Sequence, residues 1–292
     1  MLLCPECSEV ITDTAACKSG KHRFETKAGV LDLMPQLTDN RLIEEAQYTD
    51  KVVETGKMVI NRDKYMQSEM FKLRQKIFVD HITSNFHINS LTIGEIGCGP
   101  GSAIWYLRDI PFRVNYYGVD ISLKIMQAGL KSMYIPNTWK VNFSRSSAEK
   151  QLFADNSLDV VFSHSALHHL KLRPSIEWMA RTLKQGGLLL LLEPSQNNIF
   201  SRIGRKLVPA INTTEEHPLD HMEIQRLAQE NGLQLLHEQG LYYLSGALEF
   251  LISTMHSPFW LSKAIYAISR RIDNMVKSPD KAYAFLQIYR KN

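Results

Sequence analysis

The 292-residue sequence has little of several features that mark specialised classes of protein. Its 15 glycines and 11 prolines are too few for a collagen-like chain, and 44% hydrophobic with 22% charged residues excludes a coiled coil or a wholly disordered protein. The 34 basic residues exceed the 30 acidic ones by only four charges, which does not by itself indicate nucleic acid binding. The length exceeds that of an average domain, so we expect one large domain, with or without a small one.

The sequence also lacks the segments that direct a chain into or across a membrane. Its first residues have neither a basic region nor an apolar run, so we expect no secretory signal. The apolar tract 241–268 is interrupted by Glu249, His256, Pro258 and Lys263, whereas a membrane-spanning helix needs about 20 nearly uncharged residues. We therefore expect a cytoplasmic protein whose thiols stay reduced.

Cysteine is scarce, and three of the four cysteines fall in the first 17 residues. Cys4, Cys7, Cys17 and His22 have the spacing C-x2-C-x9-C-x4-H. Thiolates and imidazole at this spacing suit a closed tetrahedral zinc site, and so short a segment buries too little apolar surface to fold unaided. We predict a structural zinc-binding knuckle over residues 1–36. The alternative is a set of unrelated free thiols beside an exposed histidine.

A change of pattern divides the rest of the chain. Residues 37–90 have helical composition and are expected to form a helical lid or linker. From Leu91 onward apolar runs alternate with helical stretches, which is typical of a parallel sheet with helices on both faces. We predict an α/β fold with a seven-stranded, doubly wound, Rossmann-like sheet over residues 91–292, and a helical insertion at about 246–276. The expected strands are 91–97, 114–121, 139–143, 158–163, 187–194, 233–244 and 282–290, and the expected helices are 103–108, 123–132, 175–184 and 222–231.

A glycine-rich segment follows the first of these strands. Residues 94–101 read Gly-Glu-Ile-Gly-Cys-Gly-Pro-Gly and precede a helix expected to begin near Ser102. Glycines there allow a tight turn and a close approach of the backbone to a bound nucleoside. The next strand ends in Asp120, nineteen residues after Gly101, where a carboxylate can accept both hydroxyls of a ribose. The alternative role for Asp120 is to cap the following helix.

The spacing of the glycines bears on which cofactor is bound. A dinucleotide-binding dehydrogenase would have the pattern G-x-G-x-x-G. Here Gly97, Gly99 and Gly101 are two residues apart, and Ser102 stands where the third glycine of that pattern belongs. The spacing therefore disfavours a dehydrogenase.

In these motifs the sequence resembles the class I S-adenosylmethionine-dependent methyltransferases. Residues 95–101 match the family's first motif, which implies that they surround the methionine end and the ribose of the cofactor, and Asp120 matches the second motif. Residues 147–161 are similar to the adenine-binding turn and fourth strand, although Ser147 stands where the family often has an aspartate. The cofactor-binding residues that the resemblance implies are Glu95, Gly97, Cys98, Gly99, Gly101, Asp120, Ile121, Ser147, Ala148 and His164.

Three histidines follow the expected strand 158–163, where the resemblance places the edges of the cofactor and the acceptor. By resemblance, His164 presents its backbone to the methionine end of the cofactor, and His168 or His169 faces the acceptor. A neutral imidazole could remove a proton from the acceptor during methyl transfer, so both are candidate catalytic bases. The alternative is that these two histidines pack against or cap the next helix.

The resemblance leaves the methyl acceptor open. The insertion at 246–276 is rich in aromatic residues and methionine, which favours a small-molecule or lipid-like acceptor, while homodimer packing or core burial would explain the same composition. Arg202, Arg205 and Lys206 could bind an anionic acceptor or contact a membrane surface peripherally, or they could lie on a solvated helix.

Two other functions are open at this point. A Cys3His knuckle before this fold resembles the large-subunit rRNA guanine-N1 methyltransferases, and the basic residues of the knuckle are compatible with phosphate contact, so RNA is the alternative substrate. A catalytically inactive scaffold that only binds S-adenosylmethionine is the third hypothesis. The expected cofactors are S-adenosylmethionine, with S-adenosylhomocysteine as product, and Zn²⁺.

Overall fold

The computed structural model describes residues 2–34, 39–55, 69–195, 197–198, 219–243, 268, 271, 273 and 278–292. Its central element is one mixed sheet with the strand order β1-β2-β5-β4-β3-β6-β7-β9-β8. The strands are β1 (Glu25–Lys27), β2 (Val30–Asp32), β3 (Ser90–Ile96), β4 (Arg113–Asp120), β5 (Trp139–Arg145), β6 (Leu158–His164), β7 (Leu183–Pro194), β8 (Leu233–Leu241) and β9 (Ala284–Lys291). The helices are α1 (Asn40–Glu54), α3 (Glu69–Asn85), α4 (Ser102–Leu107), α5 (Leu123–Ser132), α6 (Leu172–Thr182) and α8 (His221–Glu230), with short 3₁₀ helices η1 (Leu167–His169) and η3 (Pro279–Lys281).

The alternation of strands and helices confirms the predicted α/β fold, but the predicted number of strands is wrong. The seven expected strands correspond to β3–β9, and the hairpin β1–β2 brings the sheet to nine. β2 pairs in parallel with β5, so that Val30 lies opposite Phe143 and Asp32 opposite Arg145. An edge strand has unpaired backbone groups, and the N-terminal hairpin satisfies those of β5.

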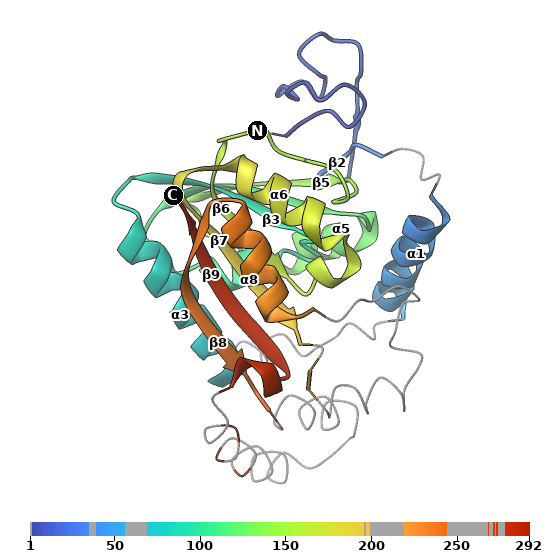
Figure 1. Cartoon of the computed structure of the whole chain (residues 1–292). Helices are drawn as coiled ribbons and strands as arrows, with labels where there is room; N and C mark the ends of the chain where they lie inside the picture. The colour runs from blue at the N-terminus through green and yellow to red at the C-terminus, as the bar shows by residue number, and fades with distance from the viewer. Residues whose placement is uncertain are drawn as a thin grey trace.

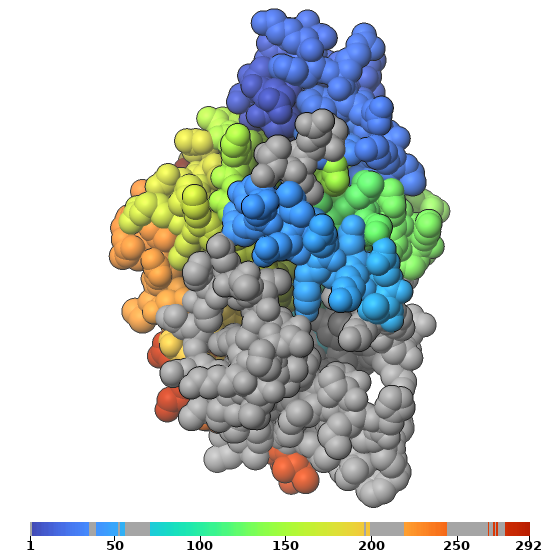
Figure 2. Space-filling model, turned by 90° about the vertical axis from the view of Figure 1, so that its right-hand side faces the viewer, coloured from blue at the N-terminus to red at the C-terminus, as the bar shows by residue number. Residues whose placement is uncertain are grey.

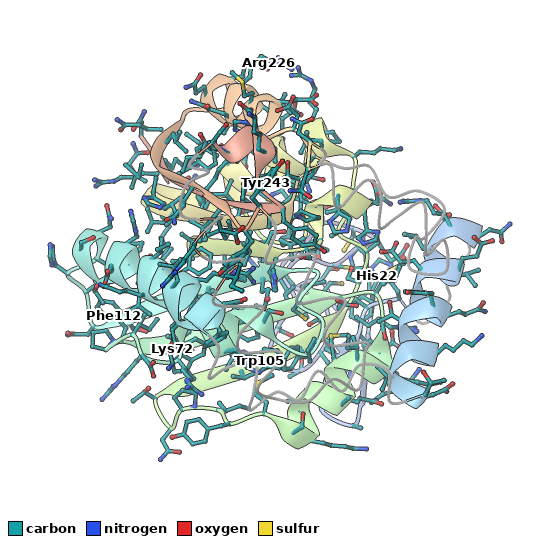
Figure 3. The ribbon with its side chains drawn as sticks, turned by 90° about the horizontal axis from the view of Figure 1, so that it is seen from below. His22, Lys72, Trp105, Phe112, Arg226 and Tyr243 are labelled. Atoms are coloured by element: carbon teal, nitrogen blue, oxygen red, sulfur yellow. The ribbon has the colours of Figure 1, made fainter. Side chains whose placement is uncertain are left out.

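The sheet separates two apolar cores, and β7 shows how the sequence divides between them. Leu188, Leu190 and Leu192 face one core, while Leu189 and Leu191 face the other. Side chains alternate between the faces of a strand, so a continuous leucine run fills both layers. Helices α3, α4 and α5 cover the first face, and α6 and α8 the second. Figures 1 and 3 show α3, which carries Lys72, and α8, which carries Arg226, on opposite sides of the sheet.

The last strand runs against its neighbours. β9 is antiparallel to both β7 and β8, with Leu190 opposite Ile288. Strands β3 to β7 are parallel, so their carboxyl ends meet at one edge. Figure 1 places α1 beside the sheet, next to α5. Polar contacts hold it there, because Ser122 Oγ donates to Asp50 at 2.6 Å and Lys124 pairs with Glu54.

Several predictions concern residues outside the described part of the chain. The helical insertion at 246–276 lies there apart from residues 268, 271 and 273, and so do Arg202, Arg205 and Lys206. The lipid-like acceptor, the peripheral membrane contact and the homodimer depend on these segments and stay predictions. Among the helices that the structure describes, none is both long enough and apolar enough to cross a membrane.

Candidate functional site

A cavity of about 850 Å³ opens at the carboxyl ends of the parallel strands. This is the edge at which α/β sheets bind their ligands. Loops after β3, β4, β5 and β6 line one side of it, and α1 lines the other. Figure 2 shows α1 on the surface of the molecule, below the N-terminal residues. Residues of α4 and α5 complete the lining, so the cavity lies between the sheet edge, α1 and these two helices.

The glycine loop after β3 forms one wall. Gly97, Gly99 and Gly101 have φ angles of 59°, 51° and 97°, in a region that residues other than glycine rarely adopt. At Gly97 a Cβ atom would lie 2.3 Å from the Cβ of Ala166, so the loops after β3 and β6 are in direct contact there. Gly97 and Gly99 line the cavity, whereas Gly101 lies at the start of α4 as its N-cap.

Two predicted cofactor residues, Glu95 near the end of β3 and Cys98 in this loop, lie behind the cavity wall in the described structure. The Glu95 carboxylate is fully buried, accepts a hydrogen bond from the hydroxyl of Tyr116 and accepts another from the backbone N–H of Ala103 at 2.9 Å. Burial raises the pKa of Glu95 well above its usual range. Cys98 is also fully buried and belongs to the apolar core. Glu95 thus fixes the glycine loop to the first turn of α4 and to β4.

Asp120 lies at the tip of β4 and lines the cavity. It accepts hydrogen bonds from the backbone N–H of Gly99 at 2.8 Å and of Ser122 at 2.9 Å. The N-cap of α5 is Ser122, whose hydroxyl accepts from the N–H of Ile125 at 3.2 Å. The alternative role of helix cap therefore belongs to Ser122, and Asp120 holds the glycine loop beside the cavity.

The turn after β5 forms a third part of the lining. Ser147 and Ala148 lie in this wall, together with Ser146, and Ile121 joins them from the end of β4. The turn brings together the residues that the resemblance assigned to the adenine side of the cofactor.

An ion pair behind this turn connects it to the N-terminal residues. Arg145 donates through Nε to Asp32 at 2.7 Å and through Nη2 at 3.1 Å, and the Asp32 carboxylate is almost fully buried. Burial opposes ionisation, but the hydrogen bonds from Lys27 and Arg145 lower the pKa of Asp32 below its usual range. The N-terminal hairpin therefore anchors the residue that immediately precedes the cavity-lining turn.

The structure separates the three histidines, of which His164 ends β6 and the other two lie in η1. His164 and His169 line the cavity, whereas His168 points to the buried carboxylate of Glu193. Burial lowers the pKa of His164 and of His169 to about 4, so both imidazoles are neutral at pH 7. A neutral imidazole can accept a proton, and of the two candidate bases it is His169 that lines the cavity.

Glu193, at the end of β7, organises the whole histidine loop. Its Oε1 accepts hydrogen bonds from the hydroxyl of Ser163 and the backbone N–H groups of Ala166 and Leu167 at 3.0–3.1 Å, and its Oε2 accepts from Nδ1 of His168 at 3.0 Å. Burial alone would raise the pKa of Glu193, but the contact with His168 and the two N–H groups lowers it. Sequence reasoning assigned Glu193 no role, although an acid ending a run of leucines is a signal for one.

Helix α1 supplies a site residue that the sequence analysis missed. Leu42, Glu45, Thr49 and Val53 line the cavity from this helix. Their spacing of three or four residues places them on one helical face, so the pattern was readable from the sequence. Oε1 of Glu45 lies 3.4 Å from Nδ1 of His169, which makes Glu45 a neighbour of the candidate base.

The cysteine cluster lies apart from this cavity, in the N-terminal residues. Nδ1 of His22 is 3.5 Å from Sγ of Cys4 and 3.7 Å from Sγ of Cys17, and all four ligand atoms, including that of Cys7, lie within 4.8 Å of one another. A tetrahedral zinc ion with bonds of about 2.3 Å to sulfur and 2.0 Å to nitrogen separates its ligand atoms by about 3.5–3.8 Å. The four side chains therefore have a spacing and donor chemistry that fit zinc.

Comparison with known proteins points to one family for the central part of the chain. Residues 94–191 match the family described as "Methyltransferase domain". Phosphoethanolamine N-methyltransferase 3 of Arabidopsis thaliana is 27% identical over 100 residues, which are 34% of this chain and 20% of that protein. Phosphoethanolamine N-methyltransferase of Plasmodium falciparum is 24% identical over 159 residues, which are 53% of this chain and 57% of that protein. The chain thus spans only a fifth of the first of these relatives.

A solved structure extends the likeness to most of the fold. Geranyl diphosphate C-methyltransferase from Streptomyces coelicolor, in complex with Mg²⁺, geranyl-S-thiolodiphosphate and S-adenosylhomocysteine, superposes with a TM-score of 0.56 at 14% identity. The superposition covers 88% of this chain and 100% of that one. At this identity the likeness concerns the fold alone. The match over residues 94–191 shows that the chain contains a methyltransferase domain, and the superposition shows that its fold is shared with a methyltransferase.

Proposed function

We propose that this chain transfers the methyl group of S-adenosylmethionine to a small-molecule acceptor by in-line displacement. The observation that carries the proposal is the cavity of about 850 Å³ at the carboxyl ends of the parallel strands. It is lined by residues of the glycine loop, by Asp120 and by the turn after β5. Its volume falls in the range of small-molecule sites. When bound there, the cofactor supplies a methyl group on a positively charged sulfur.

The lining residues divide between the parts of that cofactor. Asp120 would accept the ribose hydroxyls, Ser147 and Ala148 with Ile121 would contact the adenine, and the backbone at His164 would face the methionine end. Gly97 and Gly99 would let the backbone approach closely. Glu95, Cys98 and Gly101 would support the loop from behind, which refines their predicted role as direct contacts.

His169 is our proposed base for acceptors that lose a proton. It lines the cavity, and its imidazole is unprotonated at pH 7, as a general base must be before it acts. We assign His168 to positioning, because Glu193 holds its Nδ1 atom. If this division is right, His169→Ala lowers turnover while the affinity for S-adenosylhomocysteine stays within about threefold, whereas His168→Ala weakens both. The division would be contradicted if both substitutions lowered turnover equally and neither changed the affinity for S-adenosylhomocysteine.

The proposed acceptor is a small or lipid-like molecule. The relatives named above act on phosphoethanolamine or geranyl diphosphate according to their names, and both are small phosphorylated molecules. These names support the class of acceptor without specifying the atom that is methylated.

RNA is the alternative acceptor, and the exposed side chains of Lys18, Lys21 and Arg23 beside the cysteine cluster favour it. Binding to phosphates releases counterions, so a true RNA complex would weaken steeply with salt. We expect only weak binding of an rRNA fragment at 0.15 M salt. Tight binding with a steep salt dependence would favour RNA over the small molecule.

We also propose that Cys4, Cys7, Cys17 and His22 bind one Zn²⁺ with a structural role. Four protein ligands leave no open position for a substrate, and the cluster lies outside the lining of the cavity. The ion would replace the apolar core that the first 34 residues are too short to build.

The cofactor assignment is tested by calorimetry with the full chain. We expect S-adenosylmethionine and S-adenosylhomocysteine each to bind once per chain. Asp120→Asn weakens both by about tenfold or more, because it removes a charge-assisted hydrogen bond to the ribose. Lys140→Gln, a change on an exposed side chain of β5, is the control and leaves both affinities unchanged. Absence of binding of either compound would refute the proposed function.

A further inference from the structure

Glu45 is the one carboxylate that α1 contributes to the cofactor cavity in the described structure. Its side chain is 23% exposed, and that of His169 opposite it is 22% exposed. Oε1 of Glu45 lies 3.4 Å from Nδ1 of His169, so the two side chains are in contact within the cavity wall. The carboxylate therefore belongs to the wall that faces the cofactor, although the sequence motifs of the family do not include it.

Charged groups from several elements surround this carboxylate. Arg41, on the same helix, donates to Glu149 at 2.6 Å and to the backbone oxygen of His169 at 3.2 Å. Asp120 faces Glu45 from the end of β4, Glu149 from the turn after β5, and His168 and His169 from η1. Arg41 is the cation nearest to this group: it pairs directly with Glu149, and its charge also acts on Glu45.

With these neighbours, the ionisation of Glu45 depends on whether a further charge enters the cavity. Burial, followed by the charge of Asp120, raises the pKa of Glu45 to about 7. The pKa of His169 is lowered to about 4 by burial and then by His168, so this neighbour is uncharged near neutrality. A positive charge in the cavity would favour the ionised carboxylate.

We propose that Glu45 distinguishes the substrate form of the cofactor from the product form by charge. The sulfonium of S-adenosylmethionine carries one positive charge that the thioether of S-adenosylhomocysteine lacks. The ionised Glu45 carboxylate attracts the first form and not the second, so the cavity prefers the substrate when Glu45 is ionised and loses that preference when it is protonated. This inference rests on the proposed function, since it assumes that this cofactor occupies the cavity.

The proposal makes the preference depend on pH. Above the pKa of Glu45 the carboxylate is ionised before the cofactor arrives, and below it the sulfonium must displace a proton. The ratio of the two dissociation constants, that of S-adenosylhomocysteine over that of S-adenosylmethionine, therefore rises by about tenfold between pH 6 and pH 8. Near pH 7 the binding of S-adenosylmethionine releases a fraction of a proton, and the binding of S-adenosylhomocysteine releases less.

The experiment titrates the full chain with both compounds at pH 6 and pH 8 by calorimetry, and at pH 7 in two buffers of different ionisation enthalpy to count released protons. Glu45→Gln removes the rise in the ratio and the difference in proton release, while it still binds S-adenosylhomocysteine. Glu44→Gln, the same change on the neighbouring exposed residue of α1, keeps both. The wild-type titrations test the proposal even if Glu45→Gln does not fold.

The outcomes separate the two proposals. A ratio that is independent of pH in the wild type, or a pH dependence that survives in Glu45→Gln, overturns the role of Glu45 and leaves the cofactor assignment standing. Failure of the wild type to bind either compound overturns the proposed function itself.

Discussion

The first 34 residues and the sheet that they extend are stabilised by different means. In the centre of the sheet, each strand buries side chains on both faces, and β7 alone contributes Leu188 to Leu192 to the two cores. In residues 2–34 the buried apolar side chains are few, and two of the cysteines of the cluster, Cys4 and Cys17, are among the most buried residues. The centre of the sheet is held by the hydrophobic effect, and we propose that residues 2–34, which add only Leu2 and Val30 to the two cores, depend mainly on the candidate metal site. On this proposal, a single continuous sheet depends on two different sources of stability.

The largest expected effect comes from removing the proposed metal, which should unfold residues 2–34 and spare the rest of the sheet. Cys17→Ser, or treatment of the wild type with a chelator, removes a thiolate ligand or the ion itself, so residues 2–34 lose their main source of folding free energy. We expect loss of stoichiometric zinc by metal analysis and rapid proteolysis within these residues, while strands β3–β9 stay folded.

The matched control for this change is Cys98→Ala. This thiol is also buried, but it lies in the apolar core and not in the cluster. Its removal should leave the zinc content unchanged and cost about 1 kcal/mol of stability. Simultaneous unfolding of both regions in Cys17→Ser would contradict the separation.

Gly97→Ala tests the stability of the sheet region and should have the next largest effect. The added Cβ would meet that of Ala166 at 2.3 Å, and φ is 59°. We expect a loss of about 3 kcal/mol in the free energy of unfolding, measured in urea, and a loss of cofactor affinity, with the zinc content retained.

The control Gly232→Ala has the same kind of backbone strain without the clash. Its φ is 76°, and no atom lies within 4 Å of the added Cβ. It should cost only about 1 kcal/mol. If the two glycine substitutions are equally harmful, the contact between the loops after β3 and β6 does not matter as we describe.

The link between the two regions is tested by Asp32→Asn. This change leaves the guanidinium of Arg145 without its buried charged partner, so we expect a loss of about 2 kcal/mol in stability and weaker binding of S-adenosylhomocysteine. The pKa of Asp32 is lowered in the folded chain, so its contribution is present above about pH 4 and disappears as the pH falls through that lowered pKa. Chemical denaturation should therefore separate the variant from the wild type at pH 7, and the difference between them should narrow at pH 3.

Glu230→Gln serves as the control for that ion pair. The pair of Glu230 with Arg173 is exposed on both sides, and exposed pairs contribute little. We expect no measurable change in stability or in cofactor affinity. A comparable loss in this variant would show that the effect of Asp32→Asn does not come from burial.

The smallest expected effect concerns His221, far from the cysteine cluster. Nδ1 of His221 lies 3.0 Å from Glu238, and Nε2 lies 2.6 Å from Asp280. Burial opposes the charged imidazole, but the two carboxylates raise its pKa above the usual value. Its contribution is therefore complete below about pH 6.5 and is lost as the pH rises through the raised pKa.

We expect His221→Gln to cost less than about 1 kcal/mol at pH 6 and a smaller amount at pH 9.5, as measured by thermal unfolding. The zinc content should be unchanged at both values. A larger cost at the higher pH would contradict the assigned direction.

The sequence was sufficient for the elements whose signal is local. Apolar runs bounded by glycine or proline predicted β3–β9 within a few residues, and the glycine spacing with Asp120 located the cavity edge. It was insufficient where distant residues meet. The pairing of Val30 with Phe143 depends on an edge that no local pattern reveals, and the contacts of Glu193 with residues about thirty positions earlier depend on the parallel register of β6 and β7.

The site itself shows the same limit. Proximity in the sequence suggested that His168 and His169 share a role, but consecutive residues of η1 point in different directions, one to Glu193 and one to the cavity. Glu45 was missed because the motifs of the family do not extend to α1, although its helical face could have been read.

The central claim is that the chain methylates a small molecule. The most direct measurement incubates the purified protein with S-adenosylmethionine carrying a labelled methyl group, together with either a small-molecule extract or total RNA from the source cells. The account predicts label in the small-molecule fraction, lost in His169→Ala and in Asp120→Asn but not in Lys140→Gln. Label confined to RNA, or no transfer to either fraction, would contradict it.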